Sequence, residues 1–197
     1  MVGRHIIKAM ELSEFDSLVE GSEESQSLDF KSACNWDVKS LAKDILAFSN
    51  VQDGGYIVIG FDDKTFKRIG VTEAQAKTFD QETMQDQMAN YADPFVTFTV
   101  YNNIVDANGL RFVIIRIFEF PEIPVVCKTD SKDTSQGKIY YRSRRRRPES
   151  EPVSNSFDMR DILDRATVKM MGKRRTQGYA AESVEQKNYY DEELGGL

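Results

Sequence analysis

The 197-residue chain has 40% hydrophobic and 29% charged residues, a balance typical of a soluble globular domain and not of a membrane or disordered protein. The net charge of −6 argues against nonspecific nucleic-acid binding over the whole surface, and the single histidine argues against a histidine metal site or a Ser-His triad. Cys34 and Cys127 fit no zinc spacing and suit reduced thiols. With neither a signal peptide nor a membrane-length apolar run, the expected location is cytoplasmic.

Helices and strands alternate in the first half of the chain. Apolar residues at helical spacing indicate three helices, and short apolar runs indicate two strands. Thr72 and Gln75 have the spacing of a capping box at the start of the third helix. In chain order we expect a helix over 4–20, the strand "SLDFK", a helix capped by Asp37, a turn at Gly54-Gly55, the strand "YIVIGF", and a helix from Thr72 to about Tyr91.

Strands dominate the second half. Two long strands, "FVTFTVYNNIV" and "LRFVIIRIFEF", flank Asn108-Gly109, which favours a hairpin turn. The shorter strands "IPVVCK" and "GKIYYRSR" follow, and then a helix from Asp158. The predicted class is α+β: a mixed, largely antiparallel sheet of five or six strands, with helices packed on one face or at its ends.

The stretch "ESQSLDFK", residues 24–31, allows two interpretations. Strand alternation places Leu28 and Phe30 on one face and Asp29 and Lys31 on the other. The charged pair can form a solvent-exposed face, or it can border a site that handles phosphate. Glu24 and Asp29 are five residues apart, so their carboxylates meet only if the chain bends before the strand.

Three stretches together resemble the Schlafen AlbA-like domain family, once labelled a divergent AAA domain. They are "ESQSLDFK", "LAKDILAFSNVQDGGYIVIGFDD" and "GKIYYRSR". The resemblance covers roughly residues 20–165 and suggests a division into three parts. We expect an N-terminal helical extension over 1–20, the domain over 21–170 and a polar C-terminal tail over 171–197.

The resemblance implies a domain associated with nucleic acid. In the Schlafen branch, three acids form a metal-dependent ribonuclease centre; these correspond here to Glu24, Asp29 and Asp62, with Lys31 beside them and Asp63 an alternative third acid. Carboxylate ligands suit Mg²⁺ or Mn²⁺. Asp29 stands where the family usually has glutamate; either the shorter side chain is tolerated, or catalysis is lost and binding is kept. Binding itself requires no cofactor.

This acidic chain has one dense run of positive charge without acids among it, which we call the arginine segment. It comprises Lys138, Arg142, Arg144, Arg145, Arg146 and Arg147. Clustered arginines suit phosphate, and nearby tyrosines suit stacking on unpaired bases. The alternatives are an ordinary solvated surface and docking against an acidic protein surface.

The favoured function is nucleic-acid binding through the phosphate backbone, RNA rather than DNA, with Lys31 contributing from the sheet. One alternative is a Mg²⁺- or Mn²⁺-dependent endoribonuclease. Another is a non-catalytic module that pairs with a second copy or a protein partner through the C-terminal helix and tail. No GxxxxGK[ST] motif is present, so Gly54-Gly55 indicates a turn rather than a nucleotide-binding loop.

Overall fold

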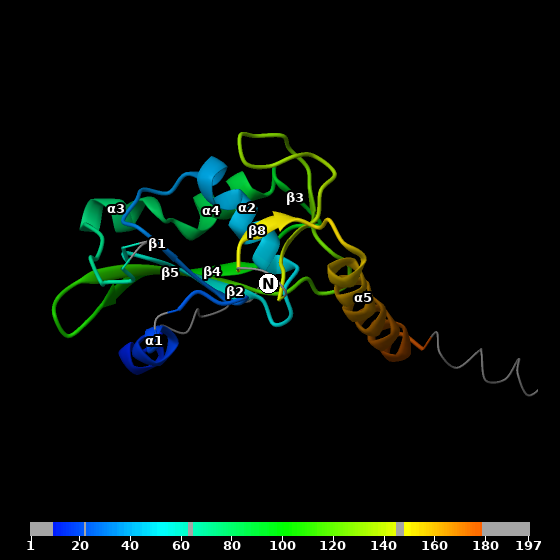
Figure 1. The fold of residues 1–197 in the computed structure, drawn as a ribbon, viewed down its shortest axis with the longest axis horizontal. Coiled ribbons are helices and arrows are strands. Elements are labelled where there is room, and N and C mark those ends of the chain that lie inside the picture. Colours follow the sequence, from blue (N-terminus) through cyan, green and yellow to red (C-terminus); the bar gives the residue numbers. More distant parts are fainter. Residues whose placement is uncertain (1–9, 22, 63–64, 145–147, 179–197) are drawn as a thin grey trace, which may run out of the picture.

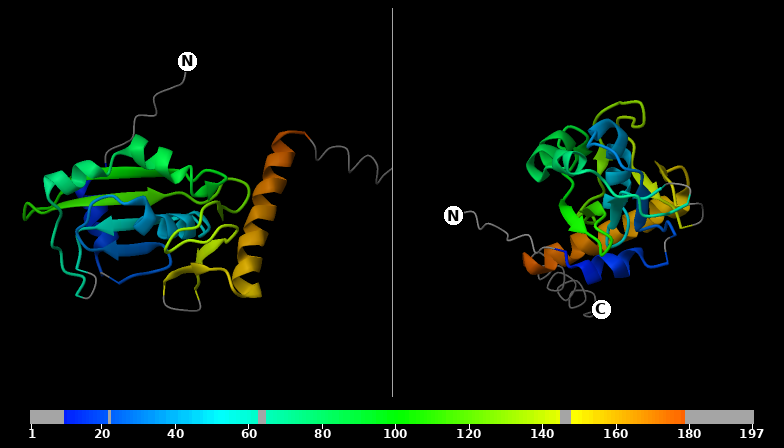
Figure 2. Two further views of the ribbon diagram at one scale, coloured as in Figure 1. Left: turned by 90° about the horizontal axis from the view of Figure 1, so that it is seen from above. Right: turned by 90° about the vertical axis from the view of Figure 1, so that its left-hand side faces the viewer.

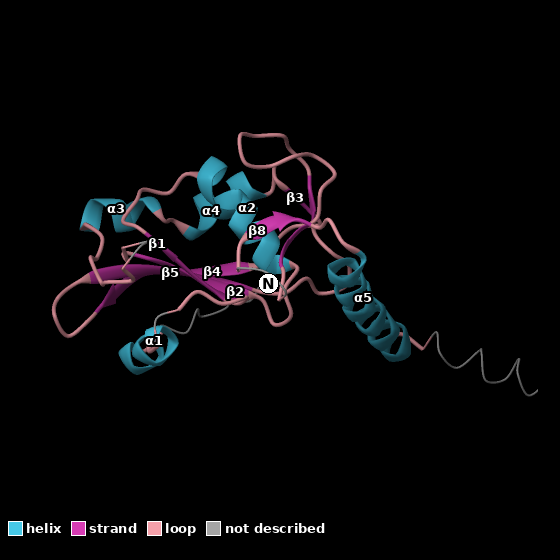
Figure 3. Ribbon diagram, in the orientation of Figure 1, coloured by secondary structure: helices cyan, strands magenta, loops and turns pink. Residues whose placement is uncertain are grey.

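The computed structural model describes residues 10–21, 23–62, 65–144 and 148–178. Its helices and strands confirm the α+β class (Figures 1 and 3). In chain order the elements are α1 (Leu12–Val19), β1 (Leu28–Lys31), α2 (Val38–Ser49), β2 (Gly55–Ile59), α3 (Glu73–Thr78), α4 (Gln81–Met88), β3 (Ala92–Asp93), β4 (Phe98–Val105), β5 (Arg111–Ile117), β6 (Val126–Cys127), β7 (Tyr140–Arg142), β8 (Ser150–Pro152) and α5 (Ser156–Thr176). None of the described helices is long and apolar enough to cross a membrane.

The main sheet has the order β1-β2-β5-β4. Strand β1 runs parallel to β2, whereas β2 with β5 and β4 with β5 are antiparallel, so the mixed, largely antiparallel character is confirmed. This sheet has four strands rather than five or six, because the short strands pair separately as β3 with β6 and β7 with β8. Strands β7 and β8 pack against α2 instead of extending the sheet.

Helices cover both faces of the sheet. The larger core lies on the face beneath α2, α3 and α4, where Ile45 and Phe48 pack with Ile57 and Ile115 (Figure 1). A smaller core lies on the opposite face, where Phe15 of α1 packs with neighbouring sheet residues. Helix α5 stands at one end of the sheet (Figure 2). The described part of the expected N-terminal extension, α1, is therefore packed onto the domain.

Two helices differ from their predicted bounds. The helix expected from Thr72 to about Tyr91 is two helices, because the Asp80 side chain accepts a hydrogen bond from the Thr83 amide and so begins α4 anew. Helix α5 starts earlier than expected, with Asn155 as its N-cap, and continues through Gly172. Residues 1–9 and 179–197, which include parts of the expected extension and tail, lie outside the described residues.

The two glycine turns behave as predicted. Gly54 has φ +73°, and a Cβ there would lie 2.1 Å from the Ile117 carbonyl oxygen, so this position needs both the conformation and the size of glycine. Gly109 has φ +79° in the β4–β5 hairpin. There the Asp106 carboxylate accepts hydrogen bonds from the amides of Asn108 and Leu110.

Candidate functional site: a buried charge network beside the arginine segment

The polar side of β1 faces α2 rather than solvent. Asp29 is 3% exposed because it lies on the same side of the sheet as the larger core. The Lys31 ammonium bridges two carboxylates, at 2.8 Å from Asp29 Oδ2 and 3.0 Å from Asp44 Oδ2 on α2. The interpretation of Asp29 and Lys31 as a solvent-facing pair is therefore wrong for Asp29, whereas the Lys31 side chain is 33% exposed.

A chain bend brings Glu24 towards this network. The Ser25 amide donates to the Leu28 carbonyl at 3.0 Å, closing a tight turn immediately before β1. Glu24 and Asp29 consequently line the same cleft, and the proximity of Asp29 adds to the effect of burial in raising the pKa of Glu24. The bend that the sequence required for these two acids to meet is confirmed.

Arg142 completes the network from β7. Its side chain is 1% exposed, and its Nη1 lies 3.1 Å from Asp29 Oδ1. Nη2 donates to the Ser25 carbonyl at 3.1 Å, and the guanidinium lies 4.7 Å from the centre of the Phe48 ring. Arg142 thus neutralises a buried carboxylate, whereas Lys138 and Arg144 of the same segment are exposed.

Burial and charge pairing act in opposite directions on the pKa values of this network. Burial alone lowers the pKa of Lys31, but Asp44 and Asp29 outweigh it and raise that pKa well above its usual range. Burial and then Asp44 raise the pKa of Asp29, against the lowering effects of Lys31 and Arg142. Burial followed by Asp29 raises the pKa of Glu24. Lys31 therefore stays protonated and holds the two aspartates together.

The three predicted metal ligands do not fit a metal ion in this arrangement. Both Asp29 oxygens face cations, Oδ2 the Lys31 ammonium and Oδ1 the Arg142 guanidinium. Asp62 turns elsewhere and accepts hydrogen bonds from the amide and hydroxyl of Thr65. Within the described ranges, no three Asp, Glu, His or Cys side chains are grouped to hold a metal ion. Asp63 lies outside those ranges.

The arginine segment divides into a buried and an exposed part. Lys138 and Arg144 are exposed, in contrast to Arg142. Arg144 is positioned by two neutral side chains: its Nε donates to Gln26 Oε1 at 2.7 Å and its Nη2 to Gln52 Oε1 at 3.1 Å. Arg145, Arg146 and Arg147 lie outside the described residues. The Arg144 charge is thus held in place without being neutralised by these partners.

The tyrosines of "KIYYRSR" do not supply an exposed stacking surface. Tyr140 and Tyr141 are 2% and 4% exposed. The Tyr141 hydroxyl donates to Asp161 of α5 at 2.7 Å and accepts from Gln26 Nε2 at 3.0 Å. Both rings belong to the larger core, so base stacking needs other aromatic residues.

The cleft beside the buried network is acidic. It has a volume of about 380 Å³. Its charged lining consists of Glu24, Asp29, Asp44, Asp133, Glu149 and Glu151 against Lys31, Lys43 and Arg142. Twice as many carboxylates as cations line it, and two of the cations are already paired with aspartates. The cleft itself therefore carries an excess of negative charge, which disfavours phosphate there.

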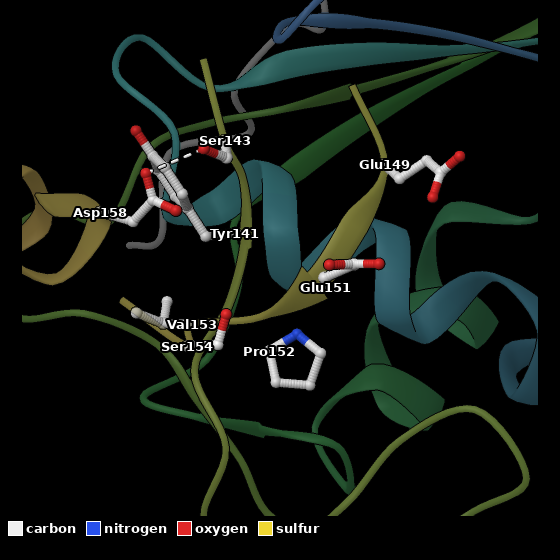
Figure 4. A pocket seen from close by; sticks show the side chains of 8 residues that line it. All are labelled: Tyr141, Ser143, Glu149, Glu151, Pro152, Val153, Ser154 and Asp158. Carbon is white, nitrogen blue, oxygen red and sulfur yellow. Dashed lines mark hydrogen bonds between the residues drawn. The ribbon is translucent and has the colours of Figure 1, made fainter. Parts of the chain in front are cut away.

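A smaller pocket lies where β7, β8 and the start of α5 meet (Figure 4). In it the Ser143 hydroxyl donates to the Asp158 carboxylate at 3.0 Å. Its volume of about 120 Å³ is well below the roughly 300 Å³ that small-molecule pockets need. Two more acids, Glu149 and Glu151, line it, so its size and charge both disfavour a nucleotide.

Asp44 is the member of the network that sequence reasoning missed. It lies on α2 three residues after Leu41 and four before Phe48, and both of these residues are buried. A carboxylate that shares a helix face with buried apolar residues must find a cation. The position of Asp44 therefore indicated a paired carboxylate, but the sequence did not identify Lys31 as its partner.

Comparisons with known proteins agree with the sequence resemblance. The model of the family "Schlafen, AlbA_2" matches residues 24–149, which include the network and the arginine segment. An uncharacterized ATP-binding protein of Ureaplasma parvum is 27% identical over 139 residues; the match covers 64% of this chain but only 39% of that protein.

Two solved structures are also similar. One is a protein of Corynebacterium diphtheriae, with a TM-score of 0.47 and 16% identity, covering 72% of this chain and 26% of that one. The other is the N-terminal domain of a putative ATP-dependent DNA helicase RecG-related protein of Nitrosomonas europaea. It has a TM-score of 0.45 and 18% identity, covering 64% of this chain and 86% of that one.

Proposed function

The chain belongs to the Schlafen AlbA_2 family, and from that premise we propose that it binds nucleic acid, RNA in preference to DNA, through the phosphate backbone at its arginine segment. The RNA preference follows the ribonuclease branch of that family. The ATP-binding name of the Ureaplasma parvum relative is not carried over, because this chain lacks the GxxxxGK[ST] motif.

One observation carries the proposal: the opposite placement of Arg142 and Arg144. The buried arginine is fixed by Asp29, and the exposed one is oriented by Gln26 and Gln52. An arginine held by neutral amides keeps its charge available to phosphate oxygens. The network thus anchors the segment, and the residues beyond it supply the contacts.

The carboxylates do not support the ribonuclease alternative. Asp29 faces two cations, and Asp62 is turned towards Thr65, so this set of carboxylates gives no basis for a catalytic metal. Binding that relies on arginines needs no divalent ion and should persist in EDTA.

The proposal is tested by fluorescence anisotropy with labelled RNA and DNA of one sequence, in EDTA, from about 50 to about 200 mM salt. We expect Arg144→Gln to weaken binding and to make the slope of log K against log salt shallower by about 0.7 for a single strand. The matched control is Arg160→Gln, an exposed arginine on α5, which should change neither quantity.

Replacing all four residues 144–147 with glutamine should remove most of the salt dependence. If this variant stays folded and binds RNA as the unmodified chain does, the proposed function is wrong. A stable oligomer without affinity for nucleic acid would instead favour the interaction module.

A further inference from the structure

A row of side chains crosses the sheet on the face that carries α1. Strand register places Leu28 opposite Tyr56, Tyr56 opposite Arg116, and Arg116 opposite Thr99, so the row spans all four strands. Phe118 follows two residues after Arg116 and therefore points to the same face. We call these five residues the sheet platform.

Helix α1 covers the neighbouring part of this face but not the sheet platform. Phe30, Val58 and Ile114 belong to the adjacent row and are buried in the smaller core with Phe15 of α1. In contrast, Tyr56 is only partly buried and Phe118 is 38% exposed. The sheet therefore presents two aromatic rings at the end that α1 leaves open.

Arg116 places a positive charge between these rings. Its guanidinium carbon lies 4.6 Å from the centre of the Tyr56 ring and 5.2 Å from that of the Phe118 ring. Among the described residues, no carboxylate forms an ion pair with it. Arginine planes and aromatic rings are the groups on which unpaired bases stack, and an unneutralised guanidinium also suits phosphate.

The sheet platform lies at the same end of the sheet as Arg144. Gln26 and Gln52, which orient Arg144, precede Leu28 of β1 and Tyr56 of β2 by two and four residues. The Tyr56 amide donates to the Ser27 carbonyl at 2.8 Å, so the starts of these two strands are tied together. The Tyr56 and Phe118 rings and Arg144 thus lie near the same two strand ends.

We propose that the sheet platform binds the unpaired bases of a single-stranded nucleic acid, with Tyr56 and Phe118 as stacking residues. This inference rests on the proposed function and adds to it the strandedness of the ligand. The arginine segment alone would bind single and double strands through phosphate. The platform favours single strands, because the bases of a duplex are already stacked on one another.

The test compares anisotropy with a labelled single-stranded RNA of about 12 nucleotides and with its duplex. Each alanine substitution, Tyr56→Ala or Phe118→Ala, should weaken single-strand binding by about fivefold or more and leave duplex binding unchanged. Tyr56→Trp, which keeps a stacking ring, should preserve affinity. The control is Ile69→Ala, an exposed apolar residue whose amide bonds to Gly60 at the opposite end of β2.

The outcomes separate the two proposals. Folded Tyr56→Ala and Phe118→Ala variants that bind single-stranded RNA normally, while Arg144→Gln still weakens it, refute the platform and leave the proposed function standing. Failure of the unmodified chain to bind either ligand refutes both. If Tyr56→Ala unfolds the protein, the more exposed Phe118→Ala decides the question.

Discussion

Arg142→Met should destabilise the protein strongly, although Arg142 belongs to a segment that looks like a solvated surface in the sequence. The arginine is 1% exposed and its charge faces Asp29, itself 3% exposed. Removing one partner of a buried ion pair typically costs about 3–5 kcal/mol, because the remaining charge is left without compensation. The Lys31 ammonium, 2.8 Å from Asp29, offsets part of this, so we expect about 3 kcal/mol.

The free energy of unfolding is measured by urea titration followed by far-UV circular dichroism. Arg144→Met is the matched control and should cost below about 1 kcal/mol, because the side chain is exposed and held only by amides. Adding Asp29→Asn to Arg142→Met should cost less than the sum of the single changes, because it removes the uncompensated charge. A loss below about 1 kcal/mol for Arg142→Met would refute the structural role of this ion pair.

Three other substitutions have defined outcomes. Burial, followed by the hydrogen bond to Asp161, raises the pKa of Tyr141 to about 12. The neutral hydroxyl therefore stabilises the fold fully below about pH 10, and this contribution is lost as the pH rises towards 12. In urea titrations the protein should be more stable than Tyr141→Phe by about 1 kcal/mol below pH 10, and the difference should shrink above it. Asn50→Ala should lower the free energy of unfolding by about 2–3 kcal/mol in the same assay, because the fully buried Asn50 amide hydrogen-bonds several backbone groups. A change near zero would contradict this role. Gly54→Ala should lower the melting temperature by several degrees, about 2 kcal/mol or more, whereas the open Gly109 should tolerate the same change better.

Most helices, strands and turns could be predicted from the sequence, because capping and turn residues act locally. The capping box at Thr72, the hairpin at Asn108-Gly109 and the turn at Gly54 all depend on residues within a few positions of one another, and all three are present. The break before α4 was missed because Asp80 has two local roles: it can continue one helix or cap the next. In the structure its side chain accepts a hydrogen bond from the Thr83 amide and so caps α4.

The candidate site was only partly predictable, because its members are far apart in the chain. The sequence identified Asp29 and Lys31 as a charged pair and required a bend beside Glu24. It could not show that Arg142, 113 residues further on, reaches Asp29, or that Asp44 completes the network from α2. Such partners depend on how β7 and α2 pack near β1, and that packing produces no periodic pattern in the sequence.

Most elements, the family and the dense run of positive charge were predictable from the amino-acid sequence, because they follow from neighbouring residues and composition. Which charges are available could be read only from the folded chain. The fold buried Arg142 against a carboxylate, left Arg144 exposed on neutral amides, and placed Tyr56 and Phe118 on the open end of the sheet. The physical reason is that desolvation and pairing depend on what surrounds a side chain in space, and residues distant in the chain supply those surroundings.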